Sequence, residues 1–213
     1  MQATNREITV RGIGKVSVAP DLIMLKMDIE TVDVDYETTM NCATKLLDTL
    51  RSAVESAGHD GRELKTTSFN VDTKYEQYKV KEEWKSRFIG YSCAHGLKLE
   101  FNLDMQMLGA TLGAIAECDA KPKLKINFSV KDTNAVSEQL LQSAIENAKS
   151  KAKILARSAG VALGEIKRID YNWSEIHIHS DTDVEAEMML CEMRIEPEAI
   201  NANDSATVVW AIG

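Results

Sequence analysis

The sequence lacks a surplus of basic residues. Among its 213 residues, 25 Lys and Arg stand against 33 Asp and Glu, which gives a formal net charge of -8 at pH 7. A protein whose main work is to hold nucleic-acid phosphates needs a basic face. The charge balance therefore argues against nucleic acid as a partner.

Long apolar runs are also missing. No stretch approaches the ~20 apolar residues of a membrane span, so we expect none. The opening residues, MQATNREITV, lack the basic and apolar regions of a secretory signal. We expect a cytoplasmic protein as given, and a periplasmic or secreted one if a signal peptide has been removed. With 44% hydrophobic and 27% charged residues, the composition is typical of globular proteins.

The cysteines form no metal or redox motif. Cys42, Cys93, Cys118 and Cys191 are widely spaced, and no C-x-x-C pair occurs. Neither a zinc knuckle nor a thioredoxin motif is present, and reduced thiols are the default interpretation.

A phosphate-binding loop is incomplete as well. The stretch ITVRGIGKVSVAPD contains Gly12 and Gly14, but Ser17 occupies the position of the third glycine in G-x-G-x-x-G. The residues alternate like a strand, and a second strand follows where a helix would have to begin. We interpret the two glycines as a close backbone approach, a bulge or a subunit contact.

Periodicity predicts the secondary structure. Apolar residues three or four apart indicate helices at 36–57, 105–117 and 134–159, and Gly58 and Gly160 are placed to end two of them. Alternation indicates strands at 8–18, 23–30, 64–78, 89–103, 124–130, 169–178 (with a bulge near 174–175) and 208–212. We expect the first two strands to form an antiparallel hairpin. The segment KVKEEWKSR is either a hairpin connection or two polar strand ends.

These elements predict an α+β fold, with a mostly antiparallel sheet of long hairpin strands packed against amphipathic helices on one side. We expect a single domain over residues 1–213. We expect an acidic surface loop at about residues 180–205, which has the composition of a partly disordered segment.

The sequence resembles the SIMPL domain family, a family of unknown function. The segments that carry the resemblance are ITVRGIGKVSVAPDLIMLKMDIET, LKTTSFNVDTKYE, IGYSCAHGLKLEF, AIENAKSKAKILARSAGVALGEI and SATVVWAI. The resemblance implies one α+β domain and assembly into large homo-oligomers. It carries no catalytic residues, so we expect no enzyme activity and no cofactor. An adaptor role with a protein partner is a further analogy.

A histidine pair is the sharpest chemical feature. His177 and His179 lie two apart on a predicted strand, so both imidazoles project from one face. Such a pair can bind zinc, copper or nickel, with a carboxylate from the acidic loop as a further ligand. A solvated strand face is the simpler interpretation, because spacing fixes only two ligands.

Two cysteines invite a nucleophile or redox interpretation. Cys93 and His95 share a strand face, but their Cβ atoms would lie ~7 Å apart, too far for a direct hydrogen bond. A packed thiol and a satisfied histidine explain them better. Cys191 lies in the acidic loop, where carboxylates raise the pKa of a thiol and blunt its reactivity.

The residues favour a non-enzymatic, oligomer-forming protein, a scaffold or a stress-related binding protein. Sheet edges and long helices would form its contacts. Lys149, Lys153 and Arg157 form a basic ridge on the longest helix, either a solvated face or a contact for another subunit's acidic loop. The alternative function is a metal-binding protein or metal-dependent hydrolase that uses His177 and His179.

Overall fold

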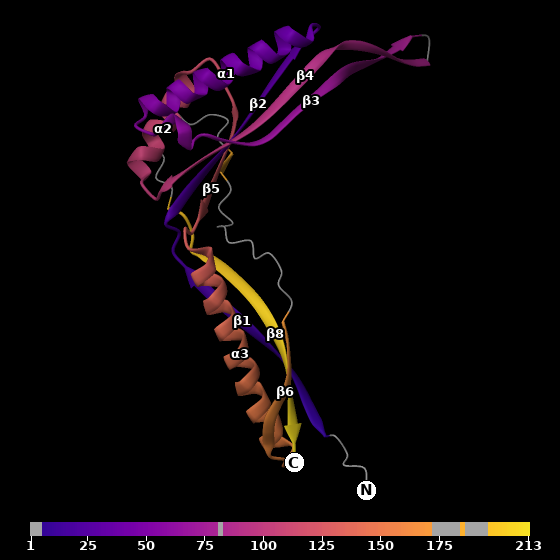
Figure 1. Cartoon of the computed structure of the whole chain (residues 1–213), viewed down its shortest axis with the longest axis vertical. Helices are drawn as coiled ribbons and strands as arrows, with labels where there is room; N and C mark the ends of the chain where they lie inside the picture. The colour runs from indigo at the N-terminus through magenta and orange to yellow at the C-terminus, as the bar shows by residue number, and fades with distance from the viewer. Residues whose placement is uncertain (1–5, 81–82, 172–183, 186–195) are drawn as a thin grey trace. The chain divides into compact units, whose positions relative to one another are not determined.

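The computed structural model describes residues 6–80, 83–171, 184–185 and 196–213, and it has the α+β class that the sequence predicts (Figure 1). The helices are α1 (Tyr36–Ser56), α2 (Met105–Glu117) and α3 (Thr133–Ser158), with a short 3-10 turn η1 (Gly61–Glu63). The strands are β1 (Glu7–Val18), β2 (Leu22–Asp33), β3 (Lys65–Val80), β4 (Glu83–Asn102), β5 (Lys123–Ser129), β6 (Leu163–Tyr171), β7 (Val184–Glu185) and β8 (Ile200–Ile212).

The helix ends follow the expected capping chemistry. Asp35, Asp104 and Asp132 each accept a hydrogen bond from a backbone N–H of the first turn of α1, α2 and α3. Gly58 and Gly160, predicted to end helices, follow α1 and α3 closely with φ of +100° and +67°.

The chain divides into two compact units. Unit 1 consists of residues 1–20, 129–181 and 198–213, and unit 2 consists of residues 21–128 and 182–197. Each unit contains one sheet of described strands, in the order β1-β8-β6 in unit 1 and β3-β4-β2-β5-β7 in unit 2.

In unit 1, α3 packs on a sheet whose central strand is β8. Strand β1 pairs with β8 in antiparallel register along its whole length, from Glu7 opposite Ala211 to Val18 opposite Ile200. The face of α3 that meets the sheet carries Ala144, Ala148 and Ala152, all fully buried. These small side chains let the helix backbone approach the sheet closely.

The two glycines of β1 explain that approach. A Cβ atom on Gly12 would overlap the carbonyl oxygen of Ala144, and one on Gly14 would overlap the carbonyl oxygen of Leu140. Of the three interpretations of these glycines, the close backbone approach is confirmed.

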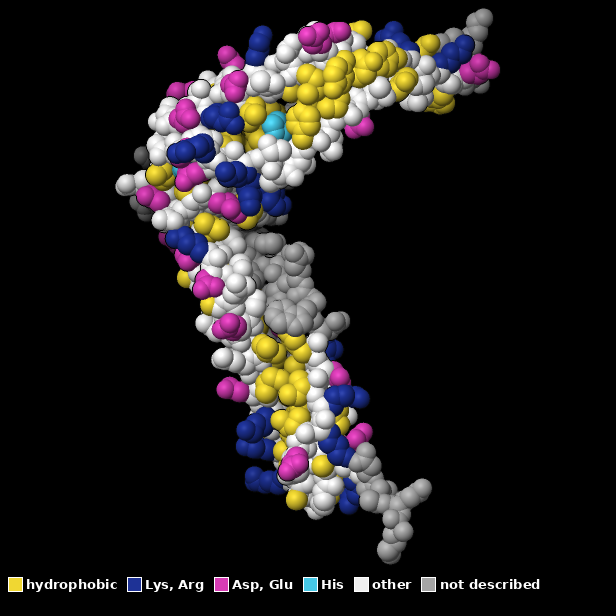
Figure 2. All heavy atoms as spheres, in the orientation of Figure 1, with side chains coloured by type: hydrophobic (Ala, Val, Ile, Leu, Met, Phe, Trp, Pro, Cys, Tyr) yellow, Lys and Arg dark blue, Asp and Glu magenta, His cyan; other side chains and the backbone are white. Residues whose placement is uncertain are grey.

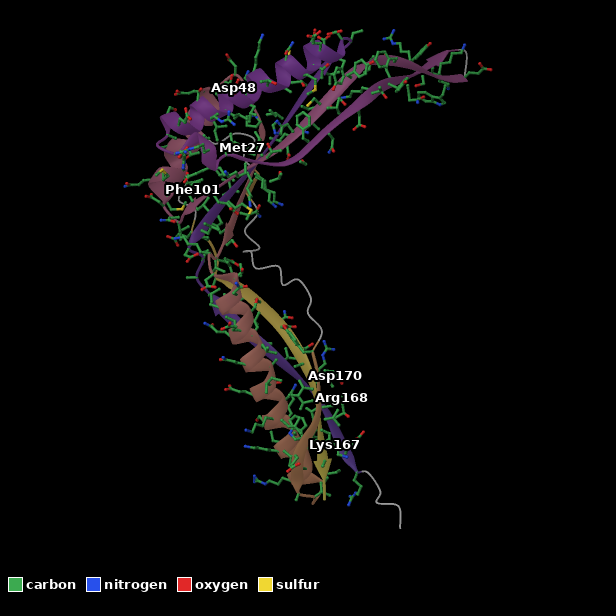
Figure 3. The ribbon with its side chains drawn as sticks, viewed as in Figure 1. Met27, Asp48, Phe101, Lys167, Arg168 and Asp170 are labelled. Carbon is green, nitrogen blue, oxygen red and sulfur yellow. The ribbon has the colours of Figure 1, made fainter. Side chains whose placement is uncertain are left out.

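In unit 2, α1 and α2 pack on one face of a larger sheet. The core contains Ile23, Leu25, Met27, Leu97, Leu99 and Phe128, with Leu50 and Val54 from α1 and Leu108 and Ile115 from α2. Figure 3 labels Met27 of β2, which is fully buried, and Phe101 of β4, which packs against the same core.

The predicted hairpin between the first two strands is wrong. β1 pairs with β8, whereas β2 pairs with β4. The alternating pattern is satisfied in both cases, because a strand's period of two does not say which neighbour supplies the hydrogen bonds. The glycines that fit β1 against α3 belong to unit 1, and β2 contributes its apolar residues to the core of unit 2.

The described residues of the polar segment KVKEEWKSR, 79–80 and 83–87, are strand ends, the second of its two predicted states. β3 runs to Val80 and β4 begins at Glu83. The predicted acidic loop at 180–205 extends too far, since β8 begins at Ile200, and β7 also lies within that range. Residues 200–205 join the ladder because Val18, Val16 and Gly14 of β1 are available as partners. The predicted bulge near 174–175 lies outside the described residues.

Candidate functional site

A row of exposed aromatic rings lies on β3, β4 and the start of α1. It consists of five rings, here called the aromatic strip: Tyr36, Phe69, Tyr75, Phe88 and Tyr91. In Figure 2 hydrophobic side chains gather along these strands. Four of the rings are large exposed hydrophobics, with exposed fractions from 42% for Phe88 to 56% for Tyr75. Exposed apolar patches of this kind mark interaction surfaces in soluble proteins.

Four of the five rings contact one another edge to face. Tyr36 meets Tyr91 at 5.5 Å between centroids, Tyr91 meets Phe88 at 5.4 Å, and Phe88 meets Tyr75 at 5.7 Å. The ring planes are inclined by 85°, 76° and 71°. This arrangement is the one that aromatic quadrupoles favour, so the surface is ordered before any partner arrives.

Tyr75 and Phe88, at the outer end of the strip, lie where β3 and β4 extend beyond the rest of their sheet. The last residue of β2, Asp33, lies opposite Tyr91. From Gly90 outward the two strands form a two-stranded ribbon, and their register shifts between Lys74 and Tyr75. Gly90 has φ of +146°, and a Cβ atom there would overlap the carbonyl oxygen of Asp33. A glycine is therefore needed where the ribbon leaves the sheet.

Polar contacts support the ribbon on its opposite face. Lys74 donates to Glu30 at 2.7 Å, and this hydrogen bond is the main reason that the pKa of Glu30 lies below its usual range. Arg87 pairs with Glu76 at 2.7 Å and lies over the ring of Tyr78 at 5.8 Å. Next to Tyr75 and Phe88, the ribbon thus has aromatic rings on one face and ion pairs on the other.

The outer edge of β3 is open among the described strands, whereas the edge of β1 is covered. β3 is the first strand of its sheet and runs for 16 residues. On β1, the N–H groups of Ile13 and Lys15 donate to Asn147 and Ser143 of α3. An uncovered edge is a template for pairing with another chain. The open edge lies beside the aromatic strip.

Cys93 and His95 lie where the sequence predicted, as packed residues. Cys93 is 1% exposed, and burial raises the pKa of its thiol. His95 Nε2 lies 2.8 Å from the hydroxyl of Thr66, and its ring meets Phe69 edge to face at 5.1 Å. Burial lowers the pKa of His95. Through His95, this pair lies next to Phe69, the strip residue farthest from the outer end of the ribbon.

The sequence analysis did not single out His59, which is buried beside α2. Its Nε2 lies 2.7 Å from Thr111 Oγ1, and that hydroxyl donates its own proton to the carbonyl of Met107 at 2.7 Å. His59 Nε2 must therefore carry the hydrogen. Burial lowers the pKa of His59, and its ring packs on Phe101.

A shallow hollow on the sheet of unit 1 has its polar groups engaged. Arg11 donates to Ser205 at 2.9 Å, and Tyr171 donates to Asp204 at 2.6 Å. The hydrogen bond to Asp204 raises the pKa of Tyr171. Arg168 and Asp170, labelled in Figure 3, pair with each other along β6 at 2.9 Å.

The predicted metal ligands His177 and His179 lie outside the described residues, as does Cys191. The metal site stays a prediction. In the part of the chain that the structure describes, no group of three or more His, Cys, Asp or Glu could hold a metal ion.

The basic ridge of Lys149, Lys153 and Arg157 is exposed on α3. Its predicted contact with an acidic loop of another subunit stays a prediction. Over the same described ranges, no helix has both the length and the apolar composition to cross a bilayer.

Fold and surface together define an α+β protein with an exposed row of aromatic rings. The chain belongs to the SIMPL family, described as proteins of unknown function (DUF541), whose family model matches residues 8–210. The family resemblance drawn from the sequence is thereby confirmed.

Two curated relatives carry the name 26 kDa periplasmic immunogenic protein. The one from Brucella melitensis is 26% identical over 163 residues, and the one from Brucella abortus is 25% identical over 163 residues. Each alignment covers 76% of this chain and 65% of the relative, so the chain spans less than two thirds of the relatives' length.

Proposed function

We propose that the protein is a non-enzymatic, self-associating protein, a scaffold or stress-related binding protein, and that the aromatic strip is its contact surface. The observation that carries this proposal is the half-exposed, preordered row of rings beside the open edge of β3. Rings in fixed orientations bind at a low entropic cost, because little side-chain freedom remains to be lost.

The geometry of the rings favours a protein partner over a stacked planar ligand. Successive rings are inclined by 71° or more, so the strip offers alternating faces and edges. A second copy of the chain presents the same alternation and can fit it, as a two-fold interface requires.

The test is the absolute mass of untagged protein by light scattering after size exclusion, across a concentration series. We expect a discrete mass above the 23.6 kDa of one chain. A Tyr75→Ala/Phe88→Ala variant should shift the protein toward monomer. Ile154→Ala/Leu155→Ala, which removes exposed apolar surface from α3, is the matched control and should leave the mass unchanged.

A second variant distinguishes loss of the contact surface from local unfolding of the ribbon. Tyr36 is the one strip residue that lies on α1 and not on the ribbon, and its ring contacts Tyr91. Tyr36→Arg should weaken assembly while the circular dichroism spectrum stays that of the wild type. A monomer at every concentration contradicts the proposal.

The alternative function, metal binding or metal-dependent hydrolysis at His177 and His179, rests on the sequence pattern. It requires stoichiometric metal in protein purified without a His tag, and loss of that metal in His177→Ala. Metal-free protein whose melting temperature is unchanged by added zinc would end this alternative.

The name of the Brucella relatives supports a periplasmic location for this protein. We therefore favour the exported alternative of the two predicted locations. Cell fractionation with a periplasmic and a cytoplasmic marker tests it, and co-fractionation with the cytoplasmic marker contradicts it.

A further inference from the structure

The outer end of the β3–β4 ribbon places an aromatic ring beside a lysine on each of its two faces. Tyr78 lies directly opposite Lys85, and Lys79 lies directly opposite Trp84. Because neighbouring residues of a strand point to opposite faces, the two pairs lie on opposite sides of the ribbon. These four residues are here called the hairpin tip.

The tip is exposed to solvent, although the Arg87 guanidinium lies over one face of the Tyr78 ring at 5.8 Å. Trp84 is the second most exposed large hydrophobic residue of the described chain, at 70%, and Tyr78 is 39% exposed. Strand β2, the neighbour of β4 in the sheet, ends opposite Tyr91 and so does not extend to the tip. The hairpin tip and the aromatic strip have no residue in common.

The tip is basic in an acidic protein. The described ribbon from Lys74 to Arg87 carries four cations and two carboxylates, and two of those cations are engaged: Lys74 with Glu30 and Arg87 with Glu76. Lys79 and Lys85 make no ion pair with any described residue. The two unpaired lysines and the one carboxylate between them, Glu83, leave the described tip with a net positive charge, while the whole chain carries -8.

We propose that the hairpin tip docks on the headgroup layer of an anionic lipid bilayer. Trp and Tyr place an apolar ring and a polar group at this depth, and a lysine stem lies along the apolar surface while its ammonium reaches the phosphates. Aromatic residues with flanking lysines are the usual anchors at a membrane–water interface.

The presence of a pair on both faces selects the lipid layer over a protein surface. A flat protein surface meets one face of a ribbon and leaves the other ring and lysine in water. A headgroup layer surrounds an inserted tip and contacts both. The ladder between the strands continues to Val80 opposite Glu83, so the backbone groups between the strands stay paired at that depth.

Vesicle flotation with the full chain tests the proposal. The probes are vesicles of phosphatidylglycerol mixed with phosphatidylcholine, compared with phosphatidylcholine alone. We expect flotation with the anionic vesicles and release by added salt. Lys79→Glu/Lys85→Glu should weaken partitioning by roughly thirtyfold or more, because each basic residue near an anionic surface contributes about fivefold.

A charge-matched control is available on α3. Lys149→Glu/Lys153→Glu makes the same change in net charge on an exposed helix face and should leave flotation unchanged. Tyr78→Ala/Trp84→Ala should also weaken binding. Brominated lipids should quench tryptophan emission of the wild type more than that of Trp84→Phe, which keeps the lysines.

Three results would overturn the proposal. One is absence of flotation with anionic vesicles, and another is equal loss in the α3 control and the tip variants. The third is a fall in assembly mass in the tip variants without any vesicle binding, which would assign the tip to a second copy of the chain. Because the strip variant Tyr75→Ala/Phe88→Ala leaves the tip residues in place, failure of self-association and failure of lipid docking are separable.

Discussion

At the scale of the residue, Gly12 and Gly14 have the least freedom to vary. Each occupies a position at which the backbone of α3 takes the space of a Cβ atom. The side chain is excluded by a carbonyl oxygen, which cannot rotate away as a side chain could. These two residues therefore set the distance between α3 and β1.

Gly12→Ala should destabilise the protein by about 1–3 kcal/mol or more, the usual range for overpacking. Gly109→Ala is the control, since Gly109 lies in α2 with no atom within 4 Å of an added Cβ. That substitution should stabilise by about 0.5–1 kcal/mol, because alanine loses less backbone entropy in a helix. Urea unfolding followed by circular dichroism measures both. Equal midpoints for Gly12→Ala and the wild type would contradict the packing described for unit 1.

The buried histidines should make stability depend on pH. Burial lowers the pKa of His59 and of His95 in the folded protein, so the unfolded state binds protons more readily. Their contribution is therefore complete above the unfolded pKa of about 6.5 and is lost as the pH falls from that value through the lower folded pKa. His59→Gln should flatten the dependence of the urea midpoint on pH between about pH 7 and 5. A slope unchanged from the wild type would rule out His59 as its source.

At the scale of the element, a helix covers the edge of β1 in one sheet, whereas no described element covers the outer edge of β3 in the other. α3 covers the edge of β1 with Asn147 and Ser143, and Lys151 Nζ donates to the carbonyl of Arg11 at 3.2 Å. The outer edge of β3 has no such cover among the described elements. An open edge can pair with another chain, which is why we propose the β3–β4 ribbon as the contact surface.

Asn147→Ala should lower the free energy of unfolding by about 1 kcal/mol, because it leaves the Ile13 N–H without its partner. Lys149→Ala, two residues along the same helix, is exposed and should change it by less than about 0.5 kcal/mol. Chemical denaturation of the two variants side by side measures the difference. Equal effects would show that α3 does not cap this edge.

The same elements show how far sequence reasoning reaches. The helices follow from their period and caps, because Asp35, Gly58, Asp132 and Gly160 act locally. The partners of β1 and β2 do not follow, because alternation is the same for any antiparallel neighbour.

The candidate site was missed for a related reason. The predicted strand at 64–78 contains Phe69 and Tyr75, but only the structure reveals that both rings are exposed and that β2 ends opposite Tyr91. The available signal was the recurrence of aromatic residues within the polar stretch YEQYKVKEEWKSRF. Rings in a segment too polar for a core indicate a surface that binds something.

At the scale of the whole molecule, the chain crosses between its two units several times. Unit 1 draws on three separate segments, and unit 2 is inserted between them. Each unit has its own apolar clusters. The predicted single domain stays a prediction, and it implies that both units unfold together.

Gly12→Ala provides the test, because the change lies wholly in unit 1. If the chain is one cooperative domain, hydrogen exchange in urea should reveal the same loss of protection in α1 of unit 2 as in α3 of unit 1. Loss confined to α3 would mean that the units unfold separately.

The central claim is that the aromatic strip is the surface through which copies of the chain associate. Hydrogen exchange with mass spectrometry, on dilute and concentrated samples of the wild type, tests it most directly. The account predicts that peptides covering residues 69–80 and 83–91 gain protection as the concentration rises, while peptides of α3 do not change. Protection that is independent of concentration in the ribbon, or gained in α3 instead, would contradict it.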